Sequence, residues 1–311
     1  MNTRKDCRVS PEICDIFCMD SVIQFKNAAA IFNHDRRQTG LIMASTGLSA
    51  MFGPATFCAV TGGSRGLGRS IAVQLAGRLG EGSRLVLTGR SLQGLQETKR
   101  QVEEGCPNQL EVKLVTGDME DTTAYPALFF DIFADTQPGD FKNALMIHNA
   151  GTVGDVSKRA AEHSDPQILN KYYATNLTSV IALTAKFMEV FPCSDVRRTV
   201  VNISSGAAIE PLAHHALYCS GKAARNMFFK VMAEEEPDVR VLSYSPGPLD
   251  TDMLQTVRSC GDKKIEDRFN AMESKGLILS PDHSAKHMCT LLDEDKFKSG
   301  AFLDVFDRFS L

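Results

Sequence analysis

The chain has 311 residues, of which 43% are hydrophobic and 23% charged, and its net charge is −4. This is the composition of a soluble globular protein, and a slightly acidic chain gives no electrostatic reason to expect nucleic acid or a membrane as a partner. The nine cysteines are an odd number, are scattered and include no C-x-x-C pair. We therefore expect no disulfide framework and no metal site, and the pattern favours a reducing compartment, the cytoplasm.

The first part of the chain differs from the rest. Residues 1–53 have no long helical or strand period, and they contain acidic residues from the start, unlike a transit peptide. The uncharged stretch between Arg37 and Arg65 raises the alternative of a membrane anchor, but Gly, Pro, Ser and Thr interrupt it. We interpret residues 1–53 as a poorly ordered N-terminal extension, with Met51 as an alternative start, and residues 54–311 as one domain.

From Thr56 onward, apolar strand-like runs alternate with helical runs. In chain order, strands are expected at 56–63, 84–90, 110–119, 143–151, 197–207, 239–248 and 298–307, and helices at 64–80, 91–105, 124–136, 165–191 and 215–235. Such alternation predicts a parallel sheet covered by helices on both faces. The predicted fold class is therefore α/β, a doubly wound, Rossmann-type parallel sheet in a single domain.

The first predicted strand runs into the glycine-rich turn TGGSRGLG, which contains Gly62, Gly66 and Gly68. Glycine allows a sharp turn and lets a pyrophosphate touch the backbone, while the free N–H groups at the helix start attract the anion. The spacing differs from the stricter dinucleotide fingerprint, and no G-K-[ST] follows, which excludes a Walker loop. Glycine turns also occur for structural reasons, so it is the position after the first strand that favours a nucleotide site.

Two arginines favour NADP over NAD. Arg90 stands at the end of the second strand, where an NAD enzyme usually carries an acid, and Arg65 lies within the glycine turn. Because arginine binds phosphate bidentately, the pair suits a 2′-phosphate; the alternative is two solvated surface arginines. We expect Asp118 at the adenine amino group and Asn149 under the cofactor, although either residue could cap a turn.

Further polar residues follow the later strands. Ser204 and Ser205 end the fifth strand, and Tyr218 lies four residues before Lys222, on the same face of a helix. A phenol is a reluctant acid at neutral pH, and a neighbouring ammonium favours its ionised form. The Ser205 hydroxyl could donate to a developing oxyanion. By itself, the Tyr-x-x-x-Lys spacing is more typical of an ordinary amphipathic surface helix than of a catalytic pair.

The motifs TGGSRGLG, NAG, a helix asparagine, NISS and Tyr-x-x-x-Lys occur in this order within residues 56–311, and in this the chain resembles the short-chain dehydrogenase/reductase family. The resemblance implies that Tyr218 is the general acid, that Ser205 orients the substrate carbonyl and that Lys222 holds the nicotinamide ribose. It implies that Asn176 supports a water-linked proton path. The residues implied for NADP(H) binding are Gly62, Gly63, Ser64, Arg65, Gly66, Leu67, Gly68, Arg90, Ser91, Asp118, Asn149, Lys222, Leu249, Asp250, Thr251, Asp252, Met253 and Leu254.

Finer matches concern the substrate. The segments GDVSK, RTVVNISS, ALYCSGKAAR, PGPLDTDM and FKSGAFLD resemble the pterin-reducing branch of the family. This resemblance implies NADPH-dependent reduction of pterin side-chain ketones, in sepiapterin or 6-pyruvoyl-tetrahydropterin, during tetrahydrobiopterin biosynthesis. It places Ser205, Tyr218, Gly247 and Asp304 at the substrate, and it implies a homodimer through the helices that start near Leu169 and Tyr218. A carboxylate is a two-oxygen acceptor that suits the adjacent amine and ring N–H of a pterin, although on sequence alone Asp304 could be a solvated acid.

Two departures and two alternatives stand beside this interpretation. His148 precedes NAG where relatives have asparagine, and residues 258–280 match poorly where the family places its substrate lid. The alternatives are a reductase of other small carbonyls, such as dicarbonyls or quinones, and a non-catalytic NADP(H)-binding regulator. We interpret Cys219 as a packing residue rather than a nucleophile.

Overall fold

The computed structural model describes residues 51–106, 110–192 and 195–307. All but the last three residues of the predicted N-terminal extension lie outside these ranges. Of those three, Met51 is buried in the core, and Gly53 donates its backbone N–H to the carbonyl of Arg78 at 3.0 Å. The packed part of the chain therefore includes Met51. Within the described residues, no helix has both the length and the apolar character needed to cross a bilayer.

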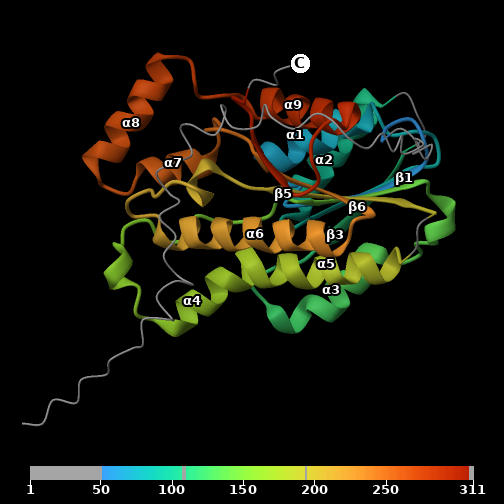
Figure 1. Ribbon diagram of the computed structural model, residues 1–311, viewed down its shortest axis with the longest axis horizontal. Helices are drawn as coiled ribbons and strands as arrows, with labels where there is room; N and C mark the ends of the chain where they lie inside the picture. Colours follow the sequence, from blue (N-terminus) through green and yellow to red (C-terminus); the bar gives the residue numbers. More distant parts are fainter. Residues whose placement is uncertain (1–50, 107–109, 193–194, 308–311) are drawn as a thin grey trace, which may run out of the picture. The chain divides into compact units, whose positions relative to one another are not determined.

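Seven parallel strands form one sheet in the order β3-β2-β1-β4-β5-β6-β7 (Figure 1). The strands are β1 (Thr56–Thr61), β2 (Arg84–Gly89), β3 (Glu111–Thr116), β4 (Asn143–His148), β5 (Arg197–Ile203), β6 (Val239–Ser245) and β7 (Ala301–Asp304). The chain starts at the centre, winds outward to β3, and returns past β1 to wind outward again to β7. The predicted doubly wound α/β fold is confirmed, and each strand lies within a predicted run.

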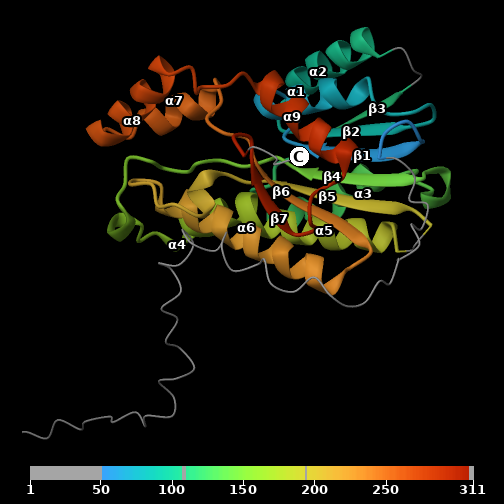
Figure 2. The same cartoon turned by 45° about the horizontal axis from the view of Figure 1, so that its top comes forward.

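Helices cover both faces of the sheet (Figures 1 and 2). One face carries α1 (Gly66–Ala76), α2 (Leu92–Gly105) and α9 (Pro281–Glu294), and the other carries α3 (Tyr125–Phe133), α5 (Ser179–Val190) and α6 (Ala216–Glu235). Because side chains alternate along a strand, β1 feeds both cores: Cys58 and Val60 enter the first, and Phe57 and Ala59 enter the second. Parallel strands buried on both faces need continuous apolar runs, which is why these runs are visible in the sequence.

The helix predicted over residues 165–191 changes pitch in its middle. It consists of α4 (Pro166–Tyr173), a π-helical turn (Ala174–Thr178) and α5. Asn176 lies in the π turn, where its side-chain Nδ2 donates to the Tyr172 carbonyl at 2.9 Å. In an α-helix that carbonyl would accept the backbone N–H of residue 176. The side chain of Asn176 thus reaches a carbonyl at the start of the π turn, a feature that is frequent at functional sites.

The lid helices, α7 (Asp252–Arg258) and α8 (Lys263–Ser274), lie apart from the two layers (Figure 2). They share a small hydrophobic core with the loop that follows β4, formed by Val153, Val156, Leu254, Val257, Cys260, Ile265 and Phe269. The chain leaves for the lid and returns from it at one place, because Leu249 and Leu279 pair as a parallel bridge. The poorly matching segment 258–280 thus forms a helical excursion above the carboxyl ends of the strands.

Candidate active site

A cavity of about 830 Å³ opens at the carboxyl ends of the central strands, and its volume falls in the range of ligand and cofactor sites. The predicted site residues that line it are Gly62, Ser64, Arg65, Gly66, Leu67, Gly68, Arg90, Asp118, Asn149, Ser205, Tyr218, Lys222, Gly247, Leu249, Asp250, Thr251, Asp252, Met253, Leu254 and Asp304. The fold therefore brings together residues from almost every predicted motif.

Three predicted site residues lie behind the lining. The backbone N–H of Gly63 donates to the Thr88 carbonyl at 2.9 Å, and the Ser91 hydroxyl caps α2 by accepting from the N–H of Gly94 at 3.1 Å. Asn176 accepts from the backbone N–H of Thr152 at 2.9 Å through its Oδ1. Each of the three thus supports a neighbouring lining segment.

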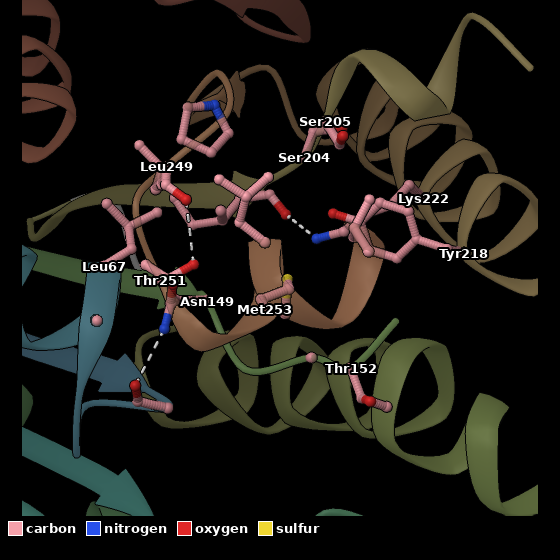
Figure 3. Close-up of a pocket in the computed structure, with 18 of the residues that line it drawn as sticks. Leu67, Asn149, Thr152, Ser204, Ser205, Tyr218, Lys222, Leu249, Thr251 and Met253 are labelled. Carbon is pink, nitrogen blue, oxygen red and sulfur yellow. Dashed lines mark hydrogen bonds between the residues drawn. The ribbon is translucent and has the colours of Figure 1, made fainter. Parts of the chain in front are cut away.

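The glycine turn is held closed by backbone and amide contacts. A Cβ on Gly68 would lie 2.1 Å from the carbonyl oxygen of Gly62, so only glycine fits there. Asn149 donates its Nδ2 to the carbonyls of Thr61 and Gly62 at 2.9 and 3.1 Å (Figure 3). Helix α1 starts directly after the turn with no side-chain cap and no acidic residue in its first turn. Its first N–H groups are therefore open to an anion, and this fits a dinucleotide pyrophosphate.

Both arginines predicted at the cofactor lie at the rim of the cavity in exposed ion pairs. Arg65 pairs with Asp252 of α7, and Arg90 lies 3.9 Å from a carboxylate oxygen of Asp118. Exposed pairs of this kind contribute about 0–1 kcal/mol. An anionic phosphate can therefore replace either carboxylate at little cost.

At the other end of the cavity, Tyr218 and Lys222 lie side by side and Ser205 faces them (Figure 3). Lys222 is buried, its Nζ donates to the backbone carbonyl of Ile203 at 2.7 Å, and it lies 5.6 Å from the centroid of the Tyr218 ring. Both side chains come from α6, which starts just after the loop that follows β5. The predicted convergence of phenol, amine and hydroxyl is present.

The electrostatics of this group differ from the expectation. Burial raises the pKa of Tyr218, and the hydrogen bond with Ser205 and the positive charge of Arg225 act in the opposite direction. Burial, and then the charge of Arg225, hold the pKa of Lys222 well below its usual value. Arg225 is therefore a cation that lowers the pKa of the phenol, in addition to Lys222, to which the sequence spacing pointed.

Arg225 was missed by the sequence analysis. It is fully buried, and its guanidinium donates to Asn202 Oδ1 at 2.8 Å and to the carbonyls of His148 and Ala150 at 2.6 and 3.3 Å. It follows Lys222 by three residues, which puts both side chains on one face of α6. This spacing was visible in the sequence.

His148, the departure from the usual motif, points away from the cavity. It is fully buried, its Nε2 lies 2.8 Å from the Thr184 hydroxyl, and its ring packs against Phe229 at 5.6 Å. Burial, and then Arg225, hold its pKa well below the usual value. The departure therefore changes the packing behind the cofactor cradle and not its lining.

A model of the family described as short chain dehydrogenase matches residues 56–260. The chain belongs to the short-chain dehydrogenase family. Sepiapterin reductase of Bos taurus is 42% identical over 255 residues, covering 81% of this chain and 95% of its own, and that of Xenopus tropicalis is 40% identical over 267 residues, covering 85% and 100%. A benzil reductase of Bacillus subtilis is 32% identical, covering 79% and 96%.

Solved structures share the fold. The KRED1-Pglu enzyme superposes with a TM-score of 0.67 at 26% identity, covering 80% of this chain and all of its own. Levodione reductase superposes with a TM-score of 0.68 at 22% identity, covering 82% and 96%. As a member of the short-chain dehydrogenase family, the chain is an oxidoreductase with a nicotinamide dinucleotide as cofactor.

The end of the cavity away from the glycine turn is formed by β7 and the lid helices. Asp304 of β7 lines the cavity, and its Oδ1 accepts from the backbone N–H of Phe306 at 3.0 Å. The lining residues here that no motif predicted are Glu210, Leu212, Arg268, Phe269, Met272 and Phe306. Arg268 and Glu210 approach to 4.0 Å and connect α8 with the loop before α6. These residues come from segments distant in sequence, so only the fold assembles them.

Proposed function

We propose that this short-chain dehydrogenase reduces side-chain ketones of pterins with NADPH, acting on sepiapterin or 6-pyruvoyl-tetrahydropterin in tetrahydrobiopterin biosynthesis. The observation that carries the proposal is that one cavity is lined by the Tyr218, Ser205 and Lys222 group and by the Asp304 carboxylate. Relatives named sepiapterin reductase, at about 40% identity along nearly their whole length, support it.

The cofactor would be held from both sides. The backbone of the glycine turn and the start of α1 would take the pyrophosphate, and residues 249–254 would cover it. Arg65 and Arg90 would bind the 2′-phosphate in place of Asp252 and Asp118, which supports NADPH over NADH. When bound, the reduced nicotinamide supplies a hydride to the carbonyl carbon.

The residues of this chain would control the proton and the orientation of the substrate. Ser205 and Tyr218 would donate hydrogen bonds to the carbonyl oxygen, and Tyr218 would transfer its phenolic proton as negative charge develops there. The raised pKa of Tyr218 keeps the phenol protonated at neutral pH, the state that reduction requires. Lys222, fixed by the Ile203 carbonyl, would hold the ribose, and Asn176 would help to relay the replacement proton.

Asp304 would anchor the pterin through its amine and ring N–H. To test this, we would compare sepiapterin with a small diketone as substrates of Asp304→Asn. We expect the KM for sepiapterin to rise at least tenfold more than the KM for the diketone, because only the pterin loses a charge-assisted pair. Asp307→Asn is the control, since an amide oxygen can still accept from the Asp304 N–H, as Asp307 does at 2.7 Å. Equal KM changes for both substrates in Asp304→Asn would refute the anchor.

Tyr218→Phe tests the catalytic role itself. We expect it to abolish NADPH oxidation with sepiapterin while the Kd for NADPH stays within about twofold, because the phenol acts on the substrate and not on the cofactor. Full turnover in Tyr218→Phe would remove the assigned proton donor. It would also separate this proposal from the alternative of a non-catalytic NADP(H)-binding regulator, in which Tyr218 is idle.

The benzil reductase relative and the apolar side chains of Phe269 and Met272 in the lid favour a second candidate, reduction of apolar dicarbonyls. The two candidates share a mechanism and differ in the pocket. A kcat/KM for benzil that exceeds that for sepiapterin would decide for the second.

We also propose a homodimer that pairs α4, α5 and α6 of two copies. Two apolar side chains four residues apart on α6, Met227 and Val231, are 60% and 44% exposed, which supports an interface there. Light scattering should report twice the mass of one chain. Met227→Asp should lower the measured mass toward that of one chain, because it places a charge in the interface. The cytoplasmic location stays a prediction from the cysteine pattern.

A further inference from the structure

Arg225 is a buried cation without a carboxylate partner in the described part of the chain. Its three hydrogen-bond acceptors, on Asn202, His148 and Ala150, are all neutral oxygens. The groups of potentially opposite charge that face it are two phenols, Tyr218 of α6 and Tyr172 of α4. A buried charge with only neutral partners is costly unless another group compensates it.

The charge on Arg225 persists at neutral pH. Burial lowers its pKa only to about 10, and arginine is the most difficult side chain to deprotonate. Lys222, the other cation of the site, is buried, and its pKa is held well below the usual value. Arg225 is therefore the permanent positive charge beneath the cavity.

The proposed reaction creates the missing counter-charge. When Tyr218 gives its proton to the substrate, it becomes a phenolate. Two basic side chains of α6 lie near it: Lys222, whose Nζ is 5.6 Å from the ring centroid, and Arg225, whose positive charge lowers the pKa of the phenol. The neighbouring titratable groups are Cys219 of α6, Tyr172 of α4 and His148 of β4. Burial raises the pKa of Tyr172 and lowers that of His148, so both stay neutral near pH 7 and neither offsets the positive charge that Arg225 adds beside Lys222.

Arg225 also joins two parts of the site. It binds the carbonyls of His148 and Ala150, and the residue between them, Asn149, holds the glycine turn closed. The helix that carries the proton donor is thereby tied to the segment that supports the cofactor cradle.

We propose that Arg225 is a positioning residue with an electrostatic role: it stabilises the Tyr218 phenolate and fixes the catalytic helix against the His148–Ala150 segment. This inference rests on the proposed role of Tyr218 as proton donor. It adds a second cation to the proton-transfer group, one that touches neither substrate nor cofactor and acts through Tyr218.

Tyrosinate absorbance can test the electrostatic role without turnover. The chain has five tyrosines and no tryptophan, so the absorbance change on raising the pH comes from few groups. The difference between the titrations of wild type and Tyr218→Phe isolates Tyr218. The same subtraction is then made in the Arg225→Gln background, between the single variant and the double variant that also carries Tyr218→Phe. We expect the ionisation constant of Tyr218 to be about tenfold lower there than in wild type, which is a pKa about one unit higher.

Arg198→Gln is the matched control, because Arg198 is another buried arginine but lies at the opposite end of β5. We expect it to lower the unfolding temperature and to leave the Tyr218 transition in place. An unchanged Tyr218 transition in Arg225→Gln would overturn the proposal. If Arg225→Gln does not fold, Arg225→Met, whose chain fills more of the space, replaces it with the same expectation.

Two further readouts separate charge from geometry and this inference from the proposed function. Arg225→Lys keeps the charge, so the Tyr218 pKa should stay within about half a unit of wild type; a shift as large as that of Arg225→Gln would contradict an electrostatic role. Alcohol oxidation, the reverse reaction, needs the phenolate. The pH profile of its kcat in Arg225→Gln should therefore move to higher pH by the same amount as the titrated pKa of Tyr218. If the proposed function is wrong and sepiapterin is not a substrate, the kcat profile cannot be measured, but the absorbance titration still tests the role of Arg225.

Discussion

Lys222 donates from its side-chain Nζ to the backbone carbonyl of Ile203 at 2.7 Å, and Ile203 is the last residue of β5. This bond attaches a flexible side chain to the end of a central strand, so its nitrogen is fixed next to the Tyr218 ring. A lysine held in this way loses little further conformational entropy when it binds a ribose hydroxyl.

Replacing this lysine should affect catalysis more than folding. We expect Lys222→Met to lower kcat for sepiapterin reduction by about 100-fold or more, the usual range for losing a group of the proton-transfer machinery. Steady-state kinetics with NADPH measure this. Lys230→Met, at an exposed position of the same helix, is the control and should keep wild-type kcat. Similar losses in both variants would indicate damage to α6 and not a specific role.

The glycine turn predicts opposite outcomes for two glycines of the first helix. Gly68→Ala would place a methyl group 2.1 Å from a backbone oxygen that cannot move aside, and we expect a loss of about 2 kcal/mol in stability and at least tenfold weaker NADPH binding. Gly77 ends α1 at φ −72°, and a methyl group there would meet no atom within 4 Å, so Gly77→Ala should be neutral or slightly stabilising. Thermal unfolding and NADPH titration measure both. Equal stability of the two variants would contradict the close approach at Gly68.

Cofactor preference should depend on the rim arginines. We expect Arg65→Gln and Arg90→Gln each to raise the KM for NADPH about tenfold, since a charge-assisted hydrogen bond contributes about 1.5–3 kcal/mol, and to leave the KM for NADH nearly unchanged. Arg100→Gln removes an exposed arginine of α2 that pairs with Glu97 and Glu104, and it serves as the charge control. A parallel rise for both cofactors would place the arginines elsewhere than at the 2′-phosphate.

Buried His148 should make the protein less stable in mild acid. Its pKa is lowered in the folded protein, so below the unfolded value of about 6.5 the unfolded chain binds a proton that the folded one does not. Stability is therefore complete above that pH and is lost as the pH falls. His148→Asn should reduce the stability loss between pH 7.5 and 5.5 by about 1 kcal/mol, measured by urea unfolding at both values.

The control is His283→Asn, at an exposed position of α9. It should change the difference between the two pH values much less than His148→Asn does, because His283 acts only by adding to the lowered pKa of His287. His215 and His287 also have lowered pKa values, through burial, and they retain part of the acid sensitivity in the His148 variant. The prediction fails if His148→Asn and wild type lose the same stability.

The strands and the site motifs could be predicted from sequence because each depends on local physics. A strand buried on both faces must be apolar throughout, as TFCAVT is, and a tight strand-to-helix turn must contain glycine. The lid helices were not predicted, because α8 buries only Ile265 and Phe269 among charged residues. Its start was nevertheless marked by Asp262, whose side chain caps the helix at the N–H of Lys264 at 2.8 Å.

Other features depend on contacts that no local pattern contains. The π turn that contains Asn176 interrupts one long helical stretch, and the continuous helical period of that stretch conceals it. Arg225 follows the recognised Tyr-x-x-x-Lys motif by one helical turn, and its role becomes visible only when the carbonyls of His148 and Ala150 are found beside it. Both features depend on contacts in three dimensions and not on local sequence propensity.

The pairing of Leu249 with Leu279 makes the intervening segment an insert that leaves and returns at one place. Because its two ends meet and its helices pack on one another, its length and side chains can change without disturbing the register of the sheet. Evolution, or an engineer, can therefore exchange the α8 part of this insert to retarget the enzyme to a differently shaped carbonyl, while residues 249–254 and the hydride and proton chemistry below stay as they are.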